Sequence, residues 1–239
     1  MEKVCYEELR PAELVARVKA TPIAYLPLGT LEWHGLHNPL GADGLQSRGF
    51  MMRLAQAAGG VVLPMLFLGP DLTKEYEGKT YYGMDFFGRP EGEAPRQLEG
   101  SAYWVDDGLY AAMLRQICAN LARVGFKIVV GHGHGPSTEQ FMALADAMKR
   151  EYGLTLLSCA SEVEPGIQTD HAAENETSIT WYFHPDLVDM SQLPPLPERP
   201  EGVMGRDPRL TASPELGQKA VETQLPLMTE KLKALLKNR

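Results

Sequence analysis

The chain contains only three cysteines, no basic run and no long apolar run, and each of these shortages excludes a class of protein. The cysteines, Cys5, Cys118 and Cys159, are odd in number, far apart and outside any C-x-x-C pattern. We therefore expect buried, reduced thiols rather than a disulfide framework.

The charge balance is acidic, with a formal net charge of −8 and a pI of about 5.3. Without a basic run, the chain is a poor candidate for binding nucleic acid or an anionic membrane surface. No apolar run is long enough to cross a bilayer, and the first segment, M-E-K-V-C-Y-E-E-L-R, lacks the apolar region of a signal peptide. We therefore expect a cytoplasmic protein with neither a nucleic-acid nor a membrane partner.

What the chain has instead is an ordinary globular composition. Its 239 residues are 44% hydrophobic, which is enough for one sizeable core. No internal repeat or shift in composition marks a boundary, so we expect a single domain over residues 1–239.

Apolar runs alternate with helical patterns along the chain. Short apolar runs predict strands, and apolar residues at spacings of three and four predict helices. Such an alternation favours an α/β fold with a mostly parallel sheet. The predicted strands are 22–28, 60–67, 126–130 and 154–159, and the predicted helices are 43–58, 106–124, 137–152, 172–183 and 214–237.

Two segments interrupt this alternation. Glu75–Gly100 is rich in Gly, Tyr and charged residues, and Ser191–Arg209 is rich in Pro. Long loops in a compact domain are often lids or binding loops. We predict a long excursion for the first segment and a surface loop for the second.

Three short segments hold five of the six histidines, each beside acidic residues or glycines. Glu, His and Asp side chains bind divalent metals such as zinc, manganese and iron. Because there are more than four candidates and several are carboxylates, the set suggests two metals that share a bridging carboxylate, an arrangement typical of hydrolysis. The segments are E-W-H-G-L-H-N-P-L-G-A-D from Glu32 to Asp43, G-H-G-H-G over 131–135, and H-A-A-E-N-E-T-S from His171 to Ser178.

Two of the segments follow predicted strands, where open α/β sheets place their ligand sites. Glu32 and His34 come just after the first strand, and His132 and His134 come just after the third. Residues i and i+2 of an extended chain point to the same side, so each pair can face one site. Asp43 lies near a predicted helix start, where the helix dipole favours a carboxylate, and it can bridge two metals.

The third segment is predicted to be helical. If the helix already includes His171, then His171, Glu174 and Ser178 share one face at positions i, i+3 and i+7. Glu176 then lies roughly 200° round the helix from Glu174. This geometry favours Glu174 over Glu176 as the carboxylate that faces the site.

Each candidate also has a structural alternative. Glu174 and Glu176 can be solvated helix charges, G-H-G-H-G can be a turn, and His37 and His184 are interpreted as structural. The concurrence of three segments, two of them at strand ends, favours metal-dependent chemistry.

Taken together, the three segments resemble the motifs of the creatininase family of metal-dependent amidohydrolases. The family's first motif, close to E-Q-H-G-x-H-L-P-L-x-T-D, is matched from Glu32 to Asp43. Its second, N-G-H-G-G-N, is best matched by H-G-H-G-P-S, which places the family histidine at His134. Its third, H-A-G-E-x-E-T-S, is matched from His171 to Ser178. The likeness covers most of the chain.

The resemblance implies a three-layer α/β/α fold and two divalent metals, with a bridging water that attacks an amide carbonyl. Zinc is the first choice of metal, with manganese and iron as alternatives. One implied metal takes Glu32, Asp43 and His134. The other takes His34, Asp43 and a further carboxylate.

The source of that further carboxylate differs from the family pattern. In creatininase, the resemblance assigns it to a glutamate two residues past the second-motif histidine, where this chain has Pro136. Glu174 is therefore assigned to the second metal, in agreement with the helical-face argument. His171 is the implied acid that protonates the leaving nitrogen.

The expected substrate is not creatinine. Creatininase surrounds its substrate with a tyrosine and two tryptophans, and the nearest positions here are Gly135, Ala160 and Ile167. The aromatic residues that can line a different pocket are Trp33, Tyr76, Tyr81, Tyr82 and Trp104.

We therefore expect a metal-dependent hydrolase that cleaves a non-peptide C–N bond in a cyclic amide or formamide of a small molecule. One alternative is a peptide-tailoring or deformylating metallohydrolase. Another is a non-catalytic relative that binds a metal or ligand. The resemblance also implies a homo-oligomer, commonly a hexamer.

Overall fold

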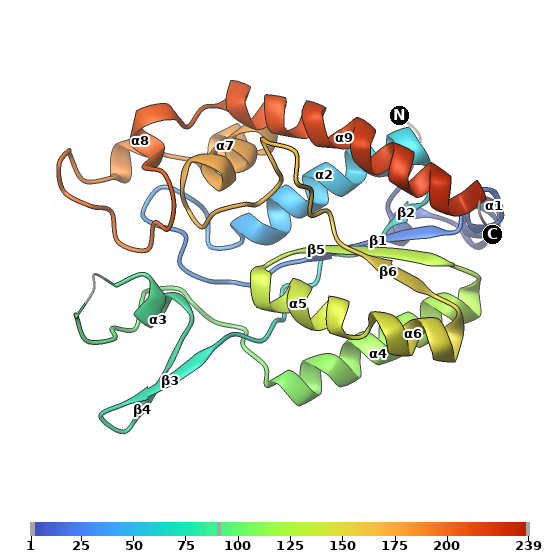
Figure 1. Ribbon diagram of the computed structural model, residues 1–239, viewed down its shortest axis with the longest axis horizontal. Helices are drawn as coiled ribbons and strands as arrows, with labels where there is room; N and C mark the ends of the chain where they lie inside the picture. The colour runs from blue at the N-terminus through green and yellow to red at the C-terminus, as the bar shows by residue number, and fades with distance from the viewer. Residues whose placement is uncertain (1–2, 90–91, 238–239) are drawn as a thin grey trace.

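A parallel β-sheet lies between two layers of helices in the computed structural model, which describes residues 3–89 and 92–237 (Figure 1). The expected three-layer α/β/α fold is confirmed. Positions 90 and 91, which belong to the predicted excursion at Glu75–Gly100, lie outside the described residues.

The main sheet of the described chain has four strands in the order β2-β1-β5-β6, all parallel. The two central strands pair over six positions, from Ile23 with Ile128 to Leu28 with Gly133. Every residue of both is buried, as expected for parallel strands covered on both faces. The strands are β1 (Ile23–Leu28), β2 (Val61–Val62), β5 (Ile128–Gly133) and β6 (Thr155–Leu157).

Alternate residues of the central strands pack into opposite helical layers, as a period of two requires. Ile23 and Tyr25 join the core beneath α2, α7 and α9, whereas Ala24 and Leu26 join the core beneath α4, α5 and α6. Figure 1 shows the first group above the sheet and the second below it. The helices are α2 (Ala42–Ala58), α7 (Glu174–Phe183), α9 (Pro214–Lys237), α4 (Asp107–Val124), α5 (Gly135–Ala143) and α6 (Ala145–Tyr152).

Several predicted elements have different bounds in the structure. The strand predicted over 60–67 is regular only at Val61–Val62, and Pro64, which lacks an N–H donor, follows it closely. The third strand continues to Gly133. The helix predicted over 137–152 is the pair α5 and α6, which meet at Leu144. Four further elements are α1 (Pro11–Ala20) and the 3-10 turns Tyr6–Glu8, Pro185–Leu187 and Met190–Gln192.

The two irregular segments lie together at one end of the molecule. The predicted excursion contains an antiparallel hairpin and a short helix, which project from the body at the lower left of Figure 1. Glu201, in the Pro-rich loop, binds both Arg89 and Arg96 of the excursion. These ion pairs connect the two segments across the end of the sheet. The elements are β3 (Thr73–Tyr76), β4 (Lys79–Tyr82), α3 (Met84–Phe87) and α8 (Pro208–Thr211).

The structure also bears on the expectations for the cysteines and for membrane-spanning segments. Cys5, Cys118 and Cys159 are free and buried, as predicted. Among the described residues, no helix combines the length and the apolar character needed to cross a membrane.

Candidate metal centre

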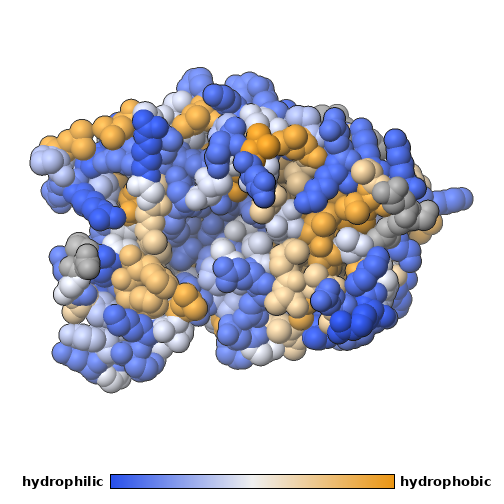
Figure 2. All heavy atoms as spheres, in the orientation of Figure 1, coloured by the Kyte–Doolittle hydropathy of each residue, from blue (hydrophilic) through white to orange (hydrophobic). Residues whose placement is uncertain are grey.

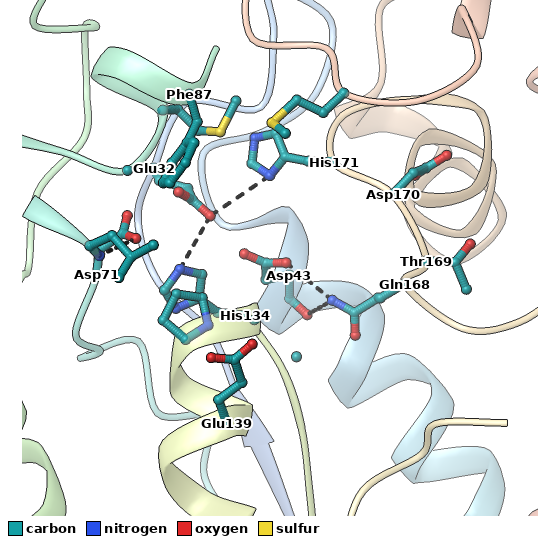
Figure 3. Close-up of a pocket in the computed structure, with 17 residues that line it drawn as sticks. Glu32, Asp43, Asp71, Phe87, His134, Glu139, Gln168, Thr169, Asp170 and His171 are labelled. Carbon is teal, nitrogen blue, oxygen red and sulfur yellow. Dashed lines mark hydrogen bonds and ion pairs between the residues drawn. The ribbon is translucent and has the colours of Figure 1, made fainter. Parts of the chain in front are cut away.

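The predicted donor residues meet at the carboxyl ends of β1 and β5. Glu32 and His34 lie on the loop that leaves β1, His134 directly follows β5, and Asp43 is in the first turn of α2. Parallel neighbouring strands end at the same edge of a sheet, so these side chains converge although they are about 100 residues apart in sequence. Figure 3 shows Glu32 between His134 and His171, with Asp43 beside them.

His34 is at the centre of this cluster. Its Nε2 atom lies 3.3 Å from Oδ2 of Asp43, 3.7 Å from Oε2 of Glu176 and 3.9 Å from Oε1 of Glu32. Oε1 of Glu32 in turn lies 3.6 Å from Nε2 of His134 and 4.0 Å from Nδ1 of His171. Six side chains from the three histidine-containing segments thus surround one small space.

In each of the three histidines, the ring nitrogen that faces away from the carboxylates makes a hydrogen bond that fixes the orientation of the ring. Nδ1 of His34 donates to the backbone carbonyl of Glu32 at 3.1 Å, and Nε2 of His171 donates to the carbonyl of Trp33 at 2.8 Å. Nδ1 of His134 is 2.9 Å from Oγ of Ser137. A carbonyl can only accept, so these bonds leave Nε2 of His34 and Nδ1 of His171 directed at the carboxylates.

The burial of the cluster tests whether a metal fits it. His34 is 0% exposed and Asp43 is 5% exposed. Neither Nε2 of His34 nor Oδ2 of Asp43 has a hydrogen-bond partner. Buried polar atoms are normally paired, because an unpaired one costs free energy. Donor atoms of His, Asp and Glu that face one another without partners fit a divalent cation.

The carboxylate of the third segment that reaches this cluster is Glu176. Glu176 is 1% exposed, and His34, Asp43 and Glu176 together form a group whose donor atoms can hold one ion. Oε1 of Glu176 accepts from Nε2 of Gln46 at 2.8 Å, and Oε2 accepts from the backbone N–H of Ala172 at 2.5 Å.

The prediction that Glu174 faces the site is therefore corrected. Its side chain turns away, binds Nη1 of Arg206 at 3.3 Å and accepts a hydrogen bond from Thr211. The helical-face argument assumed a helix that includes His171, but α7 begins only at Glu174. Ala172 has φ of +50°, so the chain turns sharply between His171 and the helix, and the assumed angular relation does not apply.

Other histidines of the three segments have structural roles. His132 is still within β5, and its Nε2 is 3.3 Å from the carbonyl of Ile167. The i and i+2 argument predicted that His132 and His134 face one site. That prediction is wrong for His132, which does not join His134 in the cluster. Nε2 of His37 lies 2.9 Å from Oγ1 of Thr177, in agreement with the structural interpretation of His37.

Sequence reasoning missed Asp71. One carboxylate oxygen of Asp71, one of Glu32 and one ring nitrogen of His134 lie within 4.8 Å of one another. Asp71 follows the second predicted strand by four residues, so the strand-end rule that found Glu32 was also a signal for Asp71. No histidine stands near it in the sequence to draw attention to it.

Opposing effects set the charge of His34. Burial lowers the pKa of its imidazolium, but Glu176, Asp43 and Glu32 together outweigh burial and raise the pKa to about 10. Burial likewise raises the pKa of Asp43, but the neighbouring His34 more than offsets burial and the pKa falls below its usual value. In the metal-free protein, a protonated His34 thus supplies positive charge among the carboxylates.

Burial dominates at the other groups of the cluster. It raises the pKa of Glu32 well above its usual value, the pKa of Glu176 to about 8 and the pKa of Asp71 to about 7. It lowers the pKa of His134 to about 4 and the pKa of His171 to about 3. Both imidazoles are therefore neutral at pH 7, with a lone pair free to bind a metal or a proton.

Four members of the cluster, Glu32, Asp43, His134 and His171, line the floor of a cavity of about 540 Å³. Figure 2 shows a recess with a largely hydrophilic interior between the hairpin end and the body of the molecule. The side chains at its rim are more apolar and come from the two irregular segments and the residues just before the first: Leu72, Met84, Phe87 and Met204. The lining also includes Asp71, Glu139, Gln168, Thr169 and Asp170.

Most of the aromatic residues predicted for the pocket lie elsewhere. Tyr82 and Trp104 stack at 5.9 Å between ring centroids and line an adjoining cavity. Trp33 is buried and donates from Nε1 to the carbonyl of Glu201. Tyr76 and Tyr81 belong to the projecting hairpin. Phe87, which sequence reasoning missed, lines the cavity of the cluster instead.

Comparisons with known proteins agree with the site and the fold. The sequence model of the Creatininase family, described as creatinine amidohydrolase, matches residues 7–232. Creatinine amidohydrolase of Pseudomonas putida is 25% identical over 232 residues, which cover 87% of this chain and 83% of that protein.

Solved structures share the fold over nearly the whole chain. A crystal structure of creatinine amidohydrolase (creatininase) has a TM-score of 0.71 at 24% identity and covers 97% of each chain. A structure named "Creatininase Mn" has a TM-score of 0.70 at 24% identity, and a mutant creatininase of "Zn-Zn type" has 0.71 at 23%, each with 98% of both chains covered. By the family match, this chain belongs to the creatininase family, whose members are hydrolases of C–N bonds other than peptide bonds.

Proposed function

We propose that this chain is a two-metal amidohydrolase that cleaves a C–N bond in a cyclic amide or formamide of a small molecule. The observation that carries the proposal is the buried donor cluster at the cavity floor, in which Nε2 of His34 and Oδ2 of Asp43 have no hydrogen-bond partner. Membership of the creatininase family supports the reaction class.

Glu32 and His134 would hold one metal, and His34 and Glu176 would hold the other. Asp43, which lies beside His34, would be shared between them, as the family resemblance implies. Bound there, two divalent ions supply a water of lowered pKa and polarise the amide carbonyl. The imidazole and carboxylate donors suit zinc first, and manganese or iron as alternatives.

His171 is the residue that we assign to proton transfer. Its Nε2–H is bound to the carbonyl of Trp33, so Nδ1 is directed at the cavity. Burial keeps the ring neutral at pH 7 by lowering its pKa to about 3. Nδ1 can therefore accept a proton from the attacking water and deliver it to the leaving nitrogen as the C–N bond breaks.

The cavity wall favours a substrate other than creatinine. At the three positions where the resemblance expects aromatic side chains around creatinine, this chain has Gly135, Ala160 and Ile167. Phe87 is the aromatic residue among the described lining residues apart from the histidines. A small molecule with an apolar portion opposite its amide fits this combination of a polar floor and an apolar rim.

We also propose that the chain forms a homo-oligomer, with a hexamer as the state implied by the resemblance. An apolar groove beside the edge strand β2 supports association. It is lined by Leu63, Met65, Leu66, Ile117 and Val124, among others. Light scattering coupled to size-exclusion chromatography would measure the mass, and a monomer at micromolar concentration would contradict this part of the proposal.

The first test is metal content per chain, by elemental analysis of protein purified without added metal or chelator. About two ions per chain, with hydrolysis of a member of a panel of cyclic amides and formamides, would support the proposal. The panel includes creatinine, which we expect to be left intact, and short formylated peptides, whose cleavage would favour the peptide-tailoring alternative. Absence of binding even after addition of zinc or manganese would indicate the non-catalytic alternative.

A further inference from the structure

Asp71 stands at the edge of the donor cluster, on the side of Glu32 and His134. Figure 3 shows it facing these two residues, across the cavity from Gln168 and Asp170. One oxygen of Asp71 and the nearest donor atoms of Glu32 and His134 all lie within 4.8 Å of one another. Donors of a single zinc ion lie roughly 2.0–2.2 Å from it, so a small side-chain rotation brings the three onto one ion.

Close backbone packing holds Asp71 in this place. A Cβ atom on Gly69, two residues earlier, would lie 2.4 Å from Oγ of Ser137 and 3.4 Å from Nδ1 of His134. The segment that carries Asp71 therefore passes directly against the His134 ring because position 69 has no side chain. Gly83 admits the carboxylate in the same way, since a Cβ atom there would overlap Oδ2 of Asp71.

The carboxylate of Asp71 is incompletely satisfied. Oδ1 accepts from the backbone N–H of Leu72 at 2.7 Å, but Oδ2 is shielded from solvent and has no partner. Neighbouring Asp85 differs, because its two oxygens accept from the backbone N–H groups of Leu98 and Tyr82. Within residues 3–89 and 92–237, no lysine or arginine forms an ion pair with Asp71.

The charge of the two proposed metals indicates that a metal ion is the missing partner of Oδ2 of Asp71. The two proposed metals carry four positive charges, whereas Glu32, Asp43 and Glu176 supply three negative charges when ionised. Asp71 brings the number of carboxylates to four and balances the two ions without a further anion. A carboxylate oxygen that is shielded from solvent and has no counterion is costly, and a coordinated metal removes that cost.

We propose that Asp71 is an additional ligand of the metal held by Glu32 and His134, so that this ion has carboxylates from Glu32, Asp43 and Asp71. The inference rests on the proposed function insofar as it requires the two metals. It adds a donor from the β2–β3 connection, a segment outside the three histidine motifs.

The test compares metal binding by the wild type, Asp71→Asn and Asp71→Ala. Each protein is stripped of metal and titrated with Zn²⁺ by isothermal calorimetry, in competition with a chelator. We expect two ions in the wild type, and in both variants a loss of about 10- to 100-fold in the affinity of one ion with the other unchanged. Titration with Co²⁺ gives a second readout, because loss of a ligand changes the visible absorption of that ion.

Glu139→Gln is the matched control. Glu139 lines the same cavity but is exposed and belongs to none of the donor groups of the described residues, so this variant should bind both ions with wild-type affinity. Asp71→Asn removes the charge but preserves the shape of the side chain, whereas Asp71→Ala removes the whole carboxylate group. If one variant fails to fold, the other still tests the proposal. Wild-type affinity and an unchanged Co²⁺ spectrum in either folded variant would overturn the proposal.

The outcomes separate this inference from the proposed function. A wild type that binds two ions but hydrolyses no amide would contradict the proposed function, and the comparison of affinities would still decide the role of Asp71. A wild type that binds no metal would overturn both. An active enzyme whose Asp71 variants bind both ions normally would overturn the inference alone.

Discussion

The floor and the rim of the cavity are built from different kinds of segment. The donor cluster at the floor is buried and lies where β1, β5, α2 and α7 begin or end. Its members His34 and Glu176, which do not themselves line the cavity, are at most 1% exposed. Three of the four rim side chains are far more accessible: Phe87 is 45%, Leu72 57% and Met204 43% exposed, whereas Met84 is buried. They lie on irregular segments that are joined to each other by Glu201 and its two arginines.

The difference in burial between floor and rim suits them to different tasks, chemistry at the floor and substrate binding at the rim. A rigid, desolvated floor can hold donor atoms in fixed positions, which metal binding and proton transfer require. An exposed rim on irregular chain can differ in shape without disturbing the sheet, and loops on a rigid scaffold commonly determine what binds. We therefore expect substitutions in the floor to abolish chemistry, and substitutions in the rim to alter substrate binding.

The largest effect is expected from Glu176→Gln. Loss of this carboxylate removes a donor from the group with His34 and Asp43, so one metal should bind at least about 10- to 100-fold more weakly, and most activity should be lost. Glu174→Gln, two residues away on the same helix, is the control, since Glu174 contacts Arg206 and Thr211. Elemental analysis of both variants checks the prediction, and normal metal content in Glu176→Gln would contradict it.

His171→Gln should separate metal binding from turnover. Both metals should remain bound, because the two proposed donor groups do not include His171. Without the imidazole, proton transfer to the leaving nitrogen is impaired, and kcat should fall roughly 10²- to 10⁴-fold. Metal content and steady-state kinetics on the same preparation measure the two properties. Full activity in this variant would eliminate the proposed proton-transfer role.

Metal binding at the floor should release protons and strengthen as the pH rises. In the metal-free protein, the pKa of His34 is raised to about 10 by the surrounding carboxylates, which outweigh burial, and burial raises the pKa of Glu176 to about 8. Both groups carry protons at pH 7 and must lose them to bind a metal, so affinity increases with pH by about tenfold per unit for each proton released.

Calorimetric titration of Zn²⁺ in two buffers with different ionisation enthalpies counts the protons. His134 should contribute none at pH 7, because burial has already lowered its pKa to about 4. An affinity that is constant between pH 6 and pH 8 would contradict the charge distribution described for the floor.

The smallest effect is expected at the rim. Glu201→Gln weakens the ion pairs to Arg89 and Arg96, which join the two irregular segments. These groups are partly exposed, so stability should fall by only about 0–1 kcal/mol. We expect a higher KM, unchanged kcat and unchanged metal content. Thermal unfolding and kinetics check this, and a large loss of kcat would show that the rim also positions the chemistry.

The sequence predicted the floor where a local rule was sufficient. Parallel strands end at one edge of the sheet, so apolar runs followed by Glu32, His34 and His134 were enough to predict their meeting. The start of a helix is a weaker local signal, and the choice of Glu174 failed for that reason. The backbone N–H groups of Asn175 and Glu176 donate to Asp170, and Ala172 adopts a positive φ, so His171 stays outside α7.

By itself, the sequence determined the layered α/β fold, the family and the meeting of four of the proposed donor residues, because hydrophobic periodicity and motif spacing express local geometry. Only the tertiary structure decided that Glu176 faces His34, that His132 does not face His134, and that Asp71 stands beside Glu32. Each of these depends on the close approach of segments distant in the chain, such as Gly69 against His134. Packing of this kind depends on all the neighbours at once, and the order of residues along one segment does not encode it.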